Sequence, residues 1–461
     1  MVAESPPRAV PSAIRRELFR LAAPIIGINV LAVITLAVDT VMCGRLENSE
    51  DALTALGFAT QLIFLLLVAM MGLTVGTVAL IARSHGGGDS ERVSHLVRQS
   101  TMLTVILGVA MGGLGFFLAE PILLVLGAEP EIATLGASYL RPLMVGATFY
   151  YLTILYSAMC RGVGNTRLPF LVALASNALN VLLNYGLILG NLGMPALGVA
   201  GAGIGTAVSL AFNVSLIVIL LKRGAVPGLV VRLTPKKIDR KLAVELLQIG
   251  LPAAIDMVIL NAAFLSIVGM LGRIDDIAVA AHGIGLRIQA LAFVPGLGIS
   301  QATGALVGQA LGGGSVERVR QITRASIVLS TLIMSVLALA IVFAAYPIVS
   351  IFDVNPGSEL ESYSVMWMQL LGYGMPIVGL HIALVGLFQG AGATRTSLRI
   401  NFYGTVFFQI PLGAVLAFPF GMGAFGLWLS FPLSFVLKAL LGYQAYRAEK
   451  WAKTGISLRG S

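Results

Sequence analysis

Long apolar stretches recur along the whole chain, separated by short clusters of charged and turn-forming residues. A helix of about 20 apolar residues crosses a bilayer core about 30 Å thick, and each stretch is long enough to do so. The pattern predicts twelve spans, at 18–43, 52–82, 97–119, 134–160, 168–190, 198–221, 243–272, 278–308, 323–347, 362–388, 398–418 and 423–445. We therefore expect an all-α integral membrane protein with twelve transmembrane helices.

The composition agrees with lipid as the main solvent of this chain. Charged residues make up 11% of its 461 residues, hydrophobic residues make up 57%, and the mean hydropathy is +0.92. A soluble domain carries about 25% charged residues. The only two cysteines, Cys43 and Cys160, do not suggest a disulfide framework or a metal site. The first residues lack the order of a signal peptide and are interpreted as a cytosolic tail.

The connections between the predicted spans alternate in charge. Those on the side of both termini are rich in Lys and Arg, and the opposite ones carry acidic residues such as Glu50, Glu129 and Glu359. Basic connections mark the cytoplasmic side, so we expect a multi-pass protein of the plasma (inner) membrane with both termini in the cytoplasm. The net charge of +9 is spread over short loops, which argues against a nucleic-acid partner.

The two halves of the chain resemble each other. LFRLAAP at 18–24 corresponds to LLQIGLP at 246–252, and CRGVGNTR at 160–167 corresponds to FQGAGATR at 388–395. Two copies with six spans each insert in the same orientation, which predicts two bundles related by a pseudo-twofold axis along the membrane normal. Such bundles suit alternating access by rocking. The predicted domains are an N-terminal tail (1–17), a lobe (18–221), a cytoplasmic linker (222–242), a second lobe (243–445) and a C-terminal tail (446–461).

Several ordered features together resemble the MATE (multidrug and toxic compound extrusion) family. They are the prolines in spans one and seven, the stretch from Asp39 to Gly44, the opening of span eight around His282, the Gly-rich ends of spans two and eight, and the paired turns RGVGNTR and QGAGATR. The resemblance implies efflux of cationic, amphipathic compounds in exchange for inward H⁺ or Na⁺. Because span ten (362–388) contains no acidic residue, the chain looks closer to the DinF-like branch than to the NorM-like one.

Only two acidic residues, Asp39 and Asp256, fall well inside predicted spans. A carboxylate in hydrocarbon costs about 2.5–3.5 kcal/mol, so such a residue is a candidate for function. Asp39 lies roughly 28 Å along a helix beyond Arg20, which places it in the outer part of the membrane. The alternative is that Asp39 only stabilises the packing of its span.

Neutral polar residues are expected near the depth of Asp39. Asn177, Asn180 and Asn184 share one face of span five, and Thr206 lies at a similar depth in span six. The DinF-like pattern has an acid in span one, an Asn and a second acid in span five, and a Thr in span six. Here Asn184 replaces the second acid. We predict an ion-coupling site of Asp39, Asn180, Asn184 and Thr206, and its single ionisable group favours H⁺ over Na⁺.

A second set of residues is predicted to line a substrate cavity. Asp256 lies in the cytoplasmic half of span seven, where it either binds a cationic substrate or makes a structural polar contact. Asp39 aligns with Ile267 in the duplication, so the second lobe lacks a carboxylate at that position. The remaining candidates are Asn177, Tyr150, Tyr373, Met375, His381 and Gln389. The alternative is lipid-facing or core packing for the tyrosines and the methionine, and structural hydrogen bonding for His381 and Gln389.

Other classes of function find less support. No GxxxxGK[ST] motif occurs, so the energy source is expected to be an ion gradient, with no cofactor and no bound metal. A flippase for lipid-linked saccharides would need several cavity arginines, and only Arg141 and Arg287 lie away from the basic loops. An intramembrane enzyme would need a catalytic constellation, and we identify no catalytic residues. The expected partners are the lipid bilayer and small molecules, and the chain is expected to be a monomer.

Overall fold

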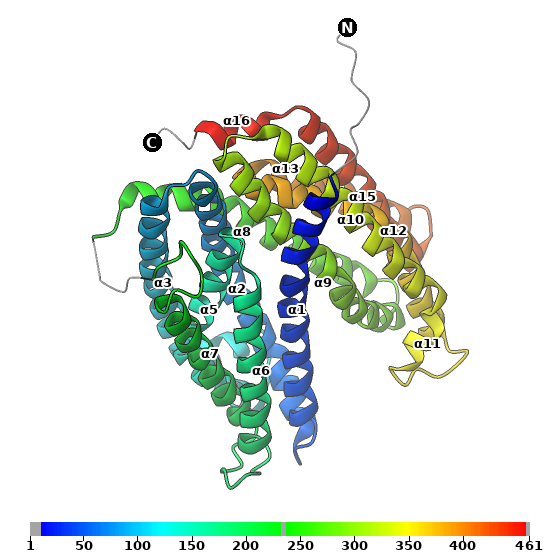
Figure 1. The fold of residues 1–461 in the computed structure, drawn as a ribbon. Coiled ribbons are helices and arrows are strands. Elements are labelled where there is room, and N and C mark those ends of the chain that lie inside the picture. Colours follow the sequence, from blue (N-terminus) through cyan, green and yellow to red (C-terminus); the bar gives the residue numbers. More distant parts are fainter. Residues whose placement is uncertain (1–10, 232–236, 458–461) are drawn as a thin grey trace. The chain divides into compact units, whose positions relative to one another are not determined.

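The computed structural model describes residues 11–231 and 237–457, and all regular elements in these two ranges are helices (Figure 1). Eleven of the described helical segments are long and apolar enough to cross a membrane. They are α1 (Ser12–Cys43), α2 (Ser49–Gly86), α3 (Ser90–Val125), α6 (Arg167–Leu187), α7 (Val199–Lys222), α8 (Arg240–Leu271), α9 (Asp276–Gly312), α10 (Val316–Phe343), α12 (Glu359–Gly390), Thr394–Ala417 and α15 (Gly423–Arg447).

A twelfth span is broken into two helices. α4 (Pro130–Val145) and α5 (Ala147–Gly162) qualify together and are bent by 55°. Pro142 has no backbone N–H for the helix ladder, and a Cβ at Gly146 would lie 2.9 Å from the Cβ of Ala207. The predicted twelve-span membrane fold is confirmed, and the span predicted at 134–160 is bent between α4 and α5.

The eleventh span is also irregular. It consists of α13 (Thr394–Phe402), the π-helical segment η1 (Tyr403–Gln409) and α14 (Ile410–Ala417). Two short helices, α11 (Ala345–Ser350) and α16 (Lys450–Ser457), complete the described elements. A π-helical turn widens the backbone locally and is frequent at functional sites.

The chain divides into two compact units. One holds Gly27–Ala254, and the other holds the described residues up to Ile26 and from Ile255 on. Both boundaries fall inside a helix, two residues after Pro24 in α1 and two residues after Pro252 in α8. The first part of each repeat's first helix therefore belongs to the unit that contains most of the other repeat.

In the Gly27–Ala254 unit, the first part of α8 packs closely on α2. A Cβ added to Gly250 would overlap the carbonyl oxygen of Gly72, and one added to Gly76 would lie 2.7 Å from the carbonyl oxygen of Leu246. Small residues let the two backbones approach, as is common where membrane helices cross. In the other unit α1 makes the matching contact, because a Cβ at Gly298 of α9 would overlap the side chain of Ile26.

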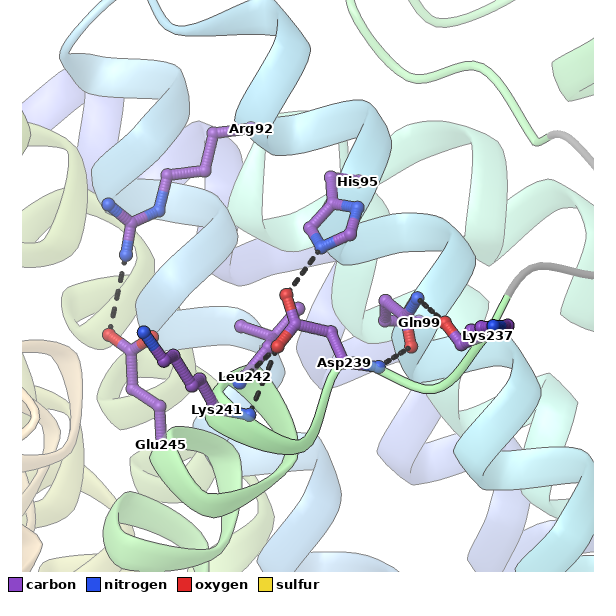
Figure 2. A network of polar contacts seen from close by, with 8 residues as sticks. All are labelled: Arg92, His95, Gln99, Lys237, Asp239, Lys241, Leu242 and Glu245. Atoms are coloured by element: carbon purple, nitrogen blue, oxygen red, sulfur yellow. Dashed lines mark hydrogen bonds and ion pairs between the residues drawn. The ribbon is translucent and has the colours of Figure 1, made fainter. Parts of the chain in front are cut away.

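The segment before α8 is held against α3 by a buried glutamine (Figure 2). The Gln99 side chain donates from Nε2 to the carbonyl oxygen of Lys237 at 3.0 Å and accepts from the backbone N–H of Asp239 at 3.1 Å. One amide thus satisfies a backbone acceptor and a backbone donor that belong to no helix. This pair of bonds fixes the end of the predicted linker to the unit that contains α3.

Asp239 directly precedes α8, and its carboxylate faces His95 of α3 (Figure 2). Its Oδ2 lies 3.0 Å from His95 Nε2, and its Oδ1 accepts from the backbone N–H groups of Lys241 and Leu242 at 3.0 and 3.2 Å. The hydrogen bond to His95, followed by that to Leu242, lowers the pKa of Asp239. Its contribution to stability is therefore present above the ordinary Asp pKa and is lost as the pH falls through the lowered value.

We predict that Gly250→Ala destabilises the protein by about 1–3 kcal/mol, because its methyl group must push α8 away from α2. The matched control is Gly269→Ala in the same helix, where an added Cβ meets nothing within 4 Å. That substitution should leave the unfolding temperature unchanged or raise it slightly. Thermal unfolding of both purified variants in detergent tests this difference, and equal effects would contradict it.

We also predict that Gln99→Leu loosens the segment before α8, because two hydrogen bonds to its backbone are lost at once. Amide hydrogen exchange of residues 237–242 should become faster, while exchange in the middle of α3 stays slow. Ser215→Ala is a suitable control, since the hydrogen bond recorded for the Ser215 hydroxyl among the described residues lies within its own helix. Unchanged exchange at 237–242 in Gln99→Leu would show that Gln99 does not hold this segment.

Candidate functional site

Asp39 lies in a buried network of side chains from α1 and α6. Only 3% of Asp39 is exposed, and Asn184 is fully buried. Nδ2 of Asn184 donates to Oδ1 of Asp39 at 2.5 Å and to Oδ1 of Asn180 at 3.2 Å. One amide therefore connects the carboxylate to the rest of the polar face of α6.

The network continues from α6 to α7. Nδ2 of Asn180 lies 3.3 Å from Oγ1 of Thr206 and 3.4 Å from Oγ of Ser209, both of which accept. The Ser209 hydroxyl donates in turn to the carbonyl oxygen of Thr206 at 2.9 Å. The structure thus brings together all four residues predicted for ion coupling. Ser209 belongs to the same network, although the sequence analysis did not single it out.

Glycines of α7 leave space for this network where α6 and α7 pack closely. A Cβ added to Gly205 would overlap Oδ1 of Asn184, and one added to Gly201 would overlap the backbone of Leu187. The loop between the two helices is also tied back, since the backbone N–H of Leu197 donates to the carbonyl oxygen of Leu187 at 2.8 Å. The glycines of α7 therefore leave space for the Asn184 amide and also let the two helices pack closely.

The Asp39 carboxylate has few partners for a buried charge. Within the described ranges, Asn184 supplies the one recorded hydrogen bond to it, and none of the recorded ion pairs involves it. Oδ1 of Asn184 is buried and has no hydrogen-bond partner among the described residues. A carboxylate without a neighbouring cation is suited to take up a proton or a small cation.

Asn177 and Tyr150 lie in the same unit as Asp39 but make other contacts. Asn177 bridges α6 to α1, because its Oδ1 accepts from the hydroxyl of Thr35 and its Nδ2 donates to the carbonyl oxygen of Ala173 at 2.7 Å. The Tyr150 ring lies 6.0 Å from that of Tyr151 on α5. Of these contacts, the one between Asn177 and Thr35 joins two helices, whereas Tyr150 and Tyr151 are neighbours on α5.

A second buried carboxylate lies in the other unit and has a similar arrangement. Oδ2 of Asp256 on α8 accepts from Nδ2 of Asn401 on α13 at 2.8 Å. As with Asp39 and Asn184, the acid comes from the first span of a repeat, the amide comes from the fifth, and 145 residues separate them. The pair is displaced along the helices, since Asp256 follows the proline of its span by four residues and Asp39 follows its own by fifteen.

The expectation that the second lobe lacks a counterpart to Asp39 thus holds only for the aligned position. A carboxylate and amide pair of the same kind is present about three helical turns earlier in the repeat. Alignment of single positions missed it because acid and amide are shifted together.

Lys438 is a buried cation that the sequence analysis did not identify. It lies on α15 with 2% of its surface exposed, and its charge and that of Asp256 attract each other. Nζ lies 3.5 Å from Oε1 of Gln409, a weak hydrogen bond, and 4.6 Å from the centre of the Phe435 ring. Gly404 in η1 packs against the Lys438 chain, where a Cβ would overlap it.

The position of Lys438 explains why it was overlooked. It lies near the predicted cytoplasmic end of the last span, where a lysine is expected to extend to the membrane surface. Lys438 nevertheless lies inside the predicted span 423–445, well before Arg447, the next basic residue, and this position could have identified it as a buried lysine. The aromatic and amide neighbours that enclose it come from other helices.

The remaining substrate-cavity candidates are dispersed. Met375 is fully buried in an apolar cluster with residues of α10, and Tyr373 is 63% exposed. His381 is buried with its ring 5.6 Å from that of Phe435, and Gln389 is partly buried at the end of α12. Among the described residues, no recorded hydrogen bond or ring contact joins any two of these four side chains.

We predict that Gly205→Ala displaces the Asn184 amide and costs about 1–3 kcal/mol of stability. Gly113→Ala is the control, because an added Cβ there meets nothing within 4 Å. In an Asn184→Ala background the same change should cost much less, since the overlapping amide is gone. A double-mutant cycle on unfolding temperatures measures this coupling, and simple additivity would contradict it.

Comparison with solved structures shows the same fold over nearly the whole chain. A structure described as MATE in the bent conformation has a TM-score of 0.87 at 21% identity, covering 96% of this chain and 97% of that one. An outward-facing conformation of a multidrug resistance MATE family transporter also has a TM-score of 0.87, at 22% identity and with 96% of both chains covered. The two-lobed helical architecture is therefore shared.

Curated relatives match with equally broad coverage. The probable multidrug resistance protein NorM of Thermotoga maritima is 28% identical over 98% of this chain and 96% of its own length. The probable multidrug resistance protein YoeA of Bacillus subtilis is 25% identical, with 94% and 93% covered. Identities of this size do not separate branches of one family, so the DinF-like assignment stays a prediction.

The MatE family model matches the chain twice, at residues 24–186 and 252–415. The two matches begin at the corresponding prolines of spans one and seven, as the internal duplication predicts, and together they cover more than half of the chain. This chain therefore belongs to the MatE family and is a multi-pass MATE transporter, not an enzyme.

Proposed function

We propose that this transporter is a multidrug efflux antiporter of the inner membrane, which exports cationic or amphipathic small molecules in exchange for H⁺ taken up at Asp39. The observation that carries the proposal is the environment of that carboxylate. Asp39 is buried on α1, and its carboxylate accepts one recorded hydrogen bond, from the Asn184 amide. It has no ion-pair partner among the described residues. The names of the relatives as multidrug resistance proteins support the substrate class.

A proton suits this environment better than a permanent negative charge does. Removing a carboxylate from water disfavours its charged form, whereas the protonated acid is neutral and needs only an acceptor. The Asn184 amide can serve both forms. Nδ2 donates to the ionised carboxylate, and after a half-turn of the amide Oδ1 would accept from the protonated acid.

This half-turn would carry the change from Asp39 into the neighbouring helices. Nδ2 of Asn184 also bonds Asn180, which in turn bonds Thr206 and Ser209 on α7. Reversing the first amide therefore requires the next one to change its partners. In our proposal these two hydrogen-bond arrangements accompany the inward- and outward-facing states of the transporter.

The transport cycle follows from the two arrangements. A proton from outside neutralises Asp39, and the hydrogen-bond network rearranges. A bound substrate is then released outward, and the protein, with the proton still on Asp39, returns to the inward-facing state. Release of the proton inside restores the first arrangement. This direction assumes the predicted orientation, with both termini in the cytoplasm, and a proton supply from outside.

Sodium is the second candidate for the coupling ion. The oxygen atoms of Asp39, Asn180, Asn184 and Thr206 are hard ligands of the kind that small cations prefer, and Oδ1 of Asn184 has no recorded partner. Only one of these ligands carries a formal charge. We therefore place H⁺ first, and expect Asn184→Asp to increase any response to Na⁺.

Flipping of a lipid-linked saccharide is the less favoured transport function. It would use free arginines to hold a pyrophosphate group, but Arg141 forms an ion pair with Glu120 at 2.9 Å. The relatives are named as multidrug resistance proteins. Both observations support export of small molecules.

We predict that Asp39→Asn reduces proton-driven efflux of ethidium, a cationic dye, by about tenfold or more, because the coupling group can no longer titrate. The measurement uses proteoliposomes with either a pH gradient or a Na⁺ gradient alone. Glu50→Gln is the control, since Glu50 is an exposed acid at the start of α2. It should retain efflux.

Three results would count against this proposal. Full proton-driven efflux by Asp39→Asn would remove Asp39 from the coupling step. Efflux driven by the Na⁺ gradient alone would replace H⁺ with Na⁺. Absence of ion-driven efflux in the wild-type protein, with properly inserted and folded protein, would reject the antiport of this substrate class.

A further inference from the structure

A partly open cavity of about 210 Å³ lies within the unit that contains the described residues from Ile255 on. Its walls come from α8, α9, α12, η1 and α15. Neither Asp39 nor Asp256 is among the residues that line it. We call it the C-lobe cavity. It is distinct from the proposed coupling site.

One wall of the C-lobe cavity is a connected group of aromatic rings. Trp367 and Trp428 stack with ring centres 5.8 Å apart, and Phe431 meets Trp367 edge to face at 5.5 Å. Phe431 also lies 4.9 Å from Phe435. Flat rings of this kind offer a large apolar surface with the geometry that another aromatic ring prefers.

Several polar groups of the cavity wall are buried without a hydrogen-bond partner, and two of them can only donate. The indole Nε1 atoms of Trp367 and Trp428 are buried and have no recorded hydrogen-bond partner. The same holds for the Thr405 hydroxyl and for both ring nitrogens of His282. An indole N–H only donates, and buried donors are rarely left unpaired in native proteins. The two indole N–H groups therefore face the cavity wall without a recorded acceptor.

Lys438 gives the C-lobe cavity a positive charge. Its ammonium group can donate three hydrogen bonds, while the structure records one long bond to Gln409 and a contact with the Phe435 ring. No carboxylate occurs among the described residues that line the cavity. Asp256 attracts this charge from outside the lining, and its Oδ2 is already bonded to Asn401.

We infer that the C-lobe cavity binds a flat aromatic compound that carries a carboxylate, with its ring against Trp367, Trp428 and Phe431 and its anionic group at Lys438. The cavity is smaller than the roughly 300–1,000 Å³ of sites for drug-sized ligands, so one or two fused rings are the expected size. This inference rests on the proposed efflux function and refines its substrates. They include aromatic acids and zwitterions besides simple cations.

The test compares two probes of the same shape and opposite charge. Tritiated 2-naphthoate is bound to purified full-length protein in a scintillation-proximity assay, with 2-naphthylmethylammonium as the cationic competitor. We expect 2-naphthoate to bind about tenfold or more tightly than the cation, because only the carboxylate can accept from Lys438. Saturable binding is compared with that of unrelated membrane protein in the same detergent.

Two charge substitutions are expected to act in opposite directions. Lys438→Met, which removes the charge and keeps an unbranched side chain one atom shorter, should weaken 2-naphthoate binding by about tenfold or more. Asp256→Asn should strengthen it, because Asp256 no longer competes for the charge of Lys438. Trp451→Phe is the control, since Trp451 lies on α16 and does not line the cavity. It should bind as the wild type does.

Folding is monitored for each variant by size-exclusion profile and unfolding temperature. If Lys438→Met is unstable because it leaves Asp256 without a countercharge, the double variant with Asp256→Asn removes both charges. That protein should fold and still bind 2-naphthoate weakly. Wild-type affinity in a folded variant without Lys438 would overturn the inference.

The assay also separates this inference from the proposed coupling function. Asp39→Asn should lose proton-driven efflux, while its 2-naphthoate binding should still be weakened by Lys438→Met, because the cavity and Asp39 lie in different units. Equal binding of the two probes by the wild-type protein would mean that charge does not select the ligand. No saturable binding of 2-naphthoate would mean that the cavity holds water only. Either result rejects the aromatic carboxylate site.

Discussion

The free-energy cost of an unpaired polar group in hydrocarbon determines most of this structure. Backbone groups avoid that cost by forming helices over nearly the whole described chain. Polar side chains avoid it by gathering inside each unit, where Asp39 meets Asn184 and Asp256 meets Asn401. Because partners are few, each remaining unpaired group is informative. The Asp39 carboxylate supports a role in ion coupling, and the donors around Lys438 indicate a ligand.

Small residues make these polar contacts possible. Gly205 leaves space for the Asn184 amide, Gly404 leaves space for the Lys438 chain, and Gly72 and Gly250 let α8 approach α2. In each case a methyl group would meet the backbone or a polar side chain. Glycine in these spans therefore does more than ease helix packing. It sets the distances at which the few polar groups find one another.

Much of the proposed coupling site was predictable because it depends on local spacing. Asn180 and Asn184 share a face of one helix by their spacing, and depth along the spans placed Asp39 and Thr206 nearby. The second cluster was not predicted, although part of it is marked in the sequence. Asn401 shares a polar stripe of the eleventh span with Ser397, Thr405 and Gln409, and Lys438 follows Ser430 and Ser434 at four-residue spacing on α15. A stripe indicates which side of a span is packed, but it does not identify the helix that packs there, so the meeting of these two residues with Asp256 was not predictable.

The sequence by itself determined the number of spans, the internal duplication, the family and the acid expected to couple transport. Every span in a bilayer must be long and apolar, so hydropathy along the chain shows where the spans lie, and counting residues from a span's end gives the depth of a side chain. Only the tertiary structure decided where α4 and α5 bend, that Gln99 holds the segment before α8, and that Lys438 faces an aromatic cavity. These features depend on contacts between helices far apart in the chain, and the apolar pattern of a span does not record its neighbours.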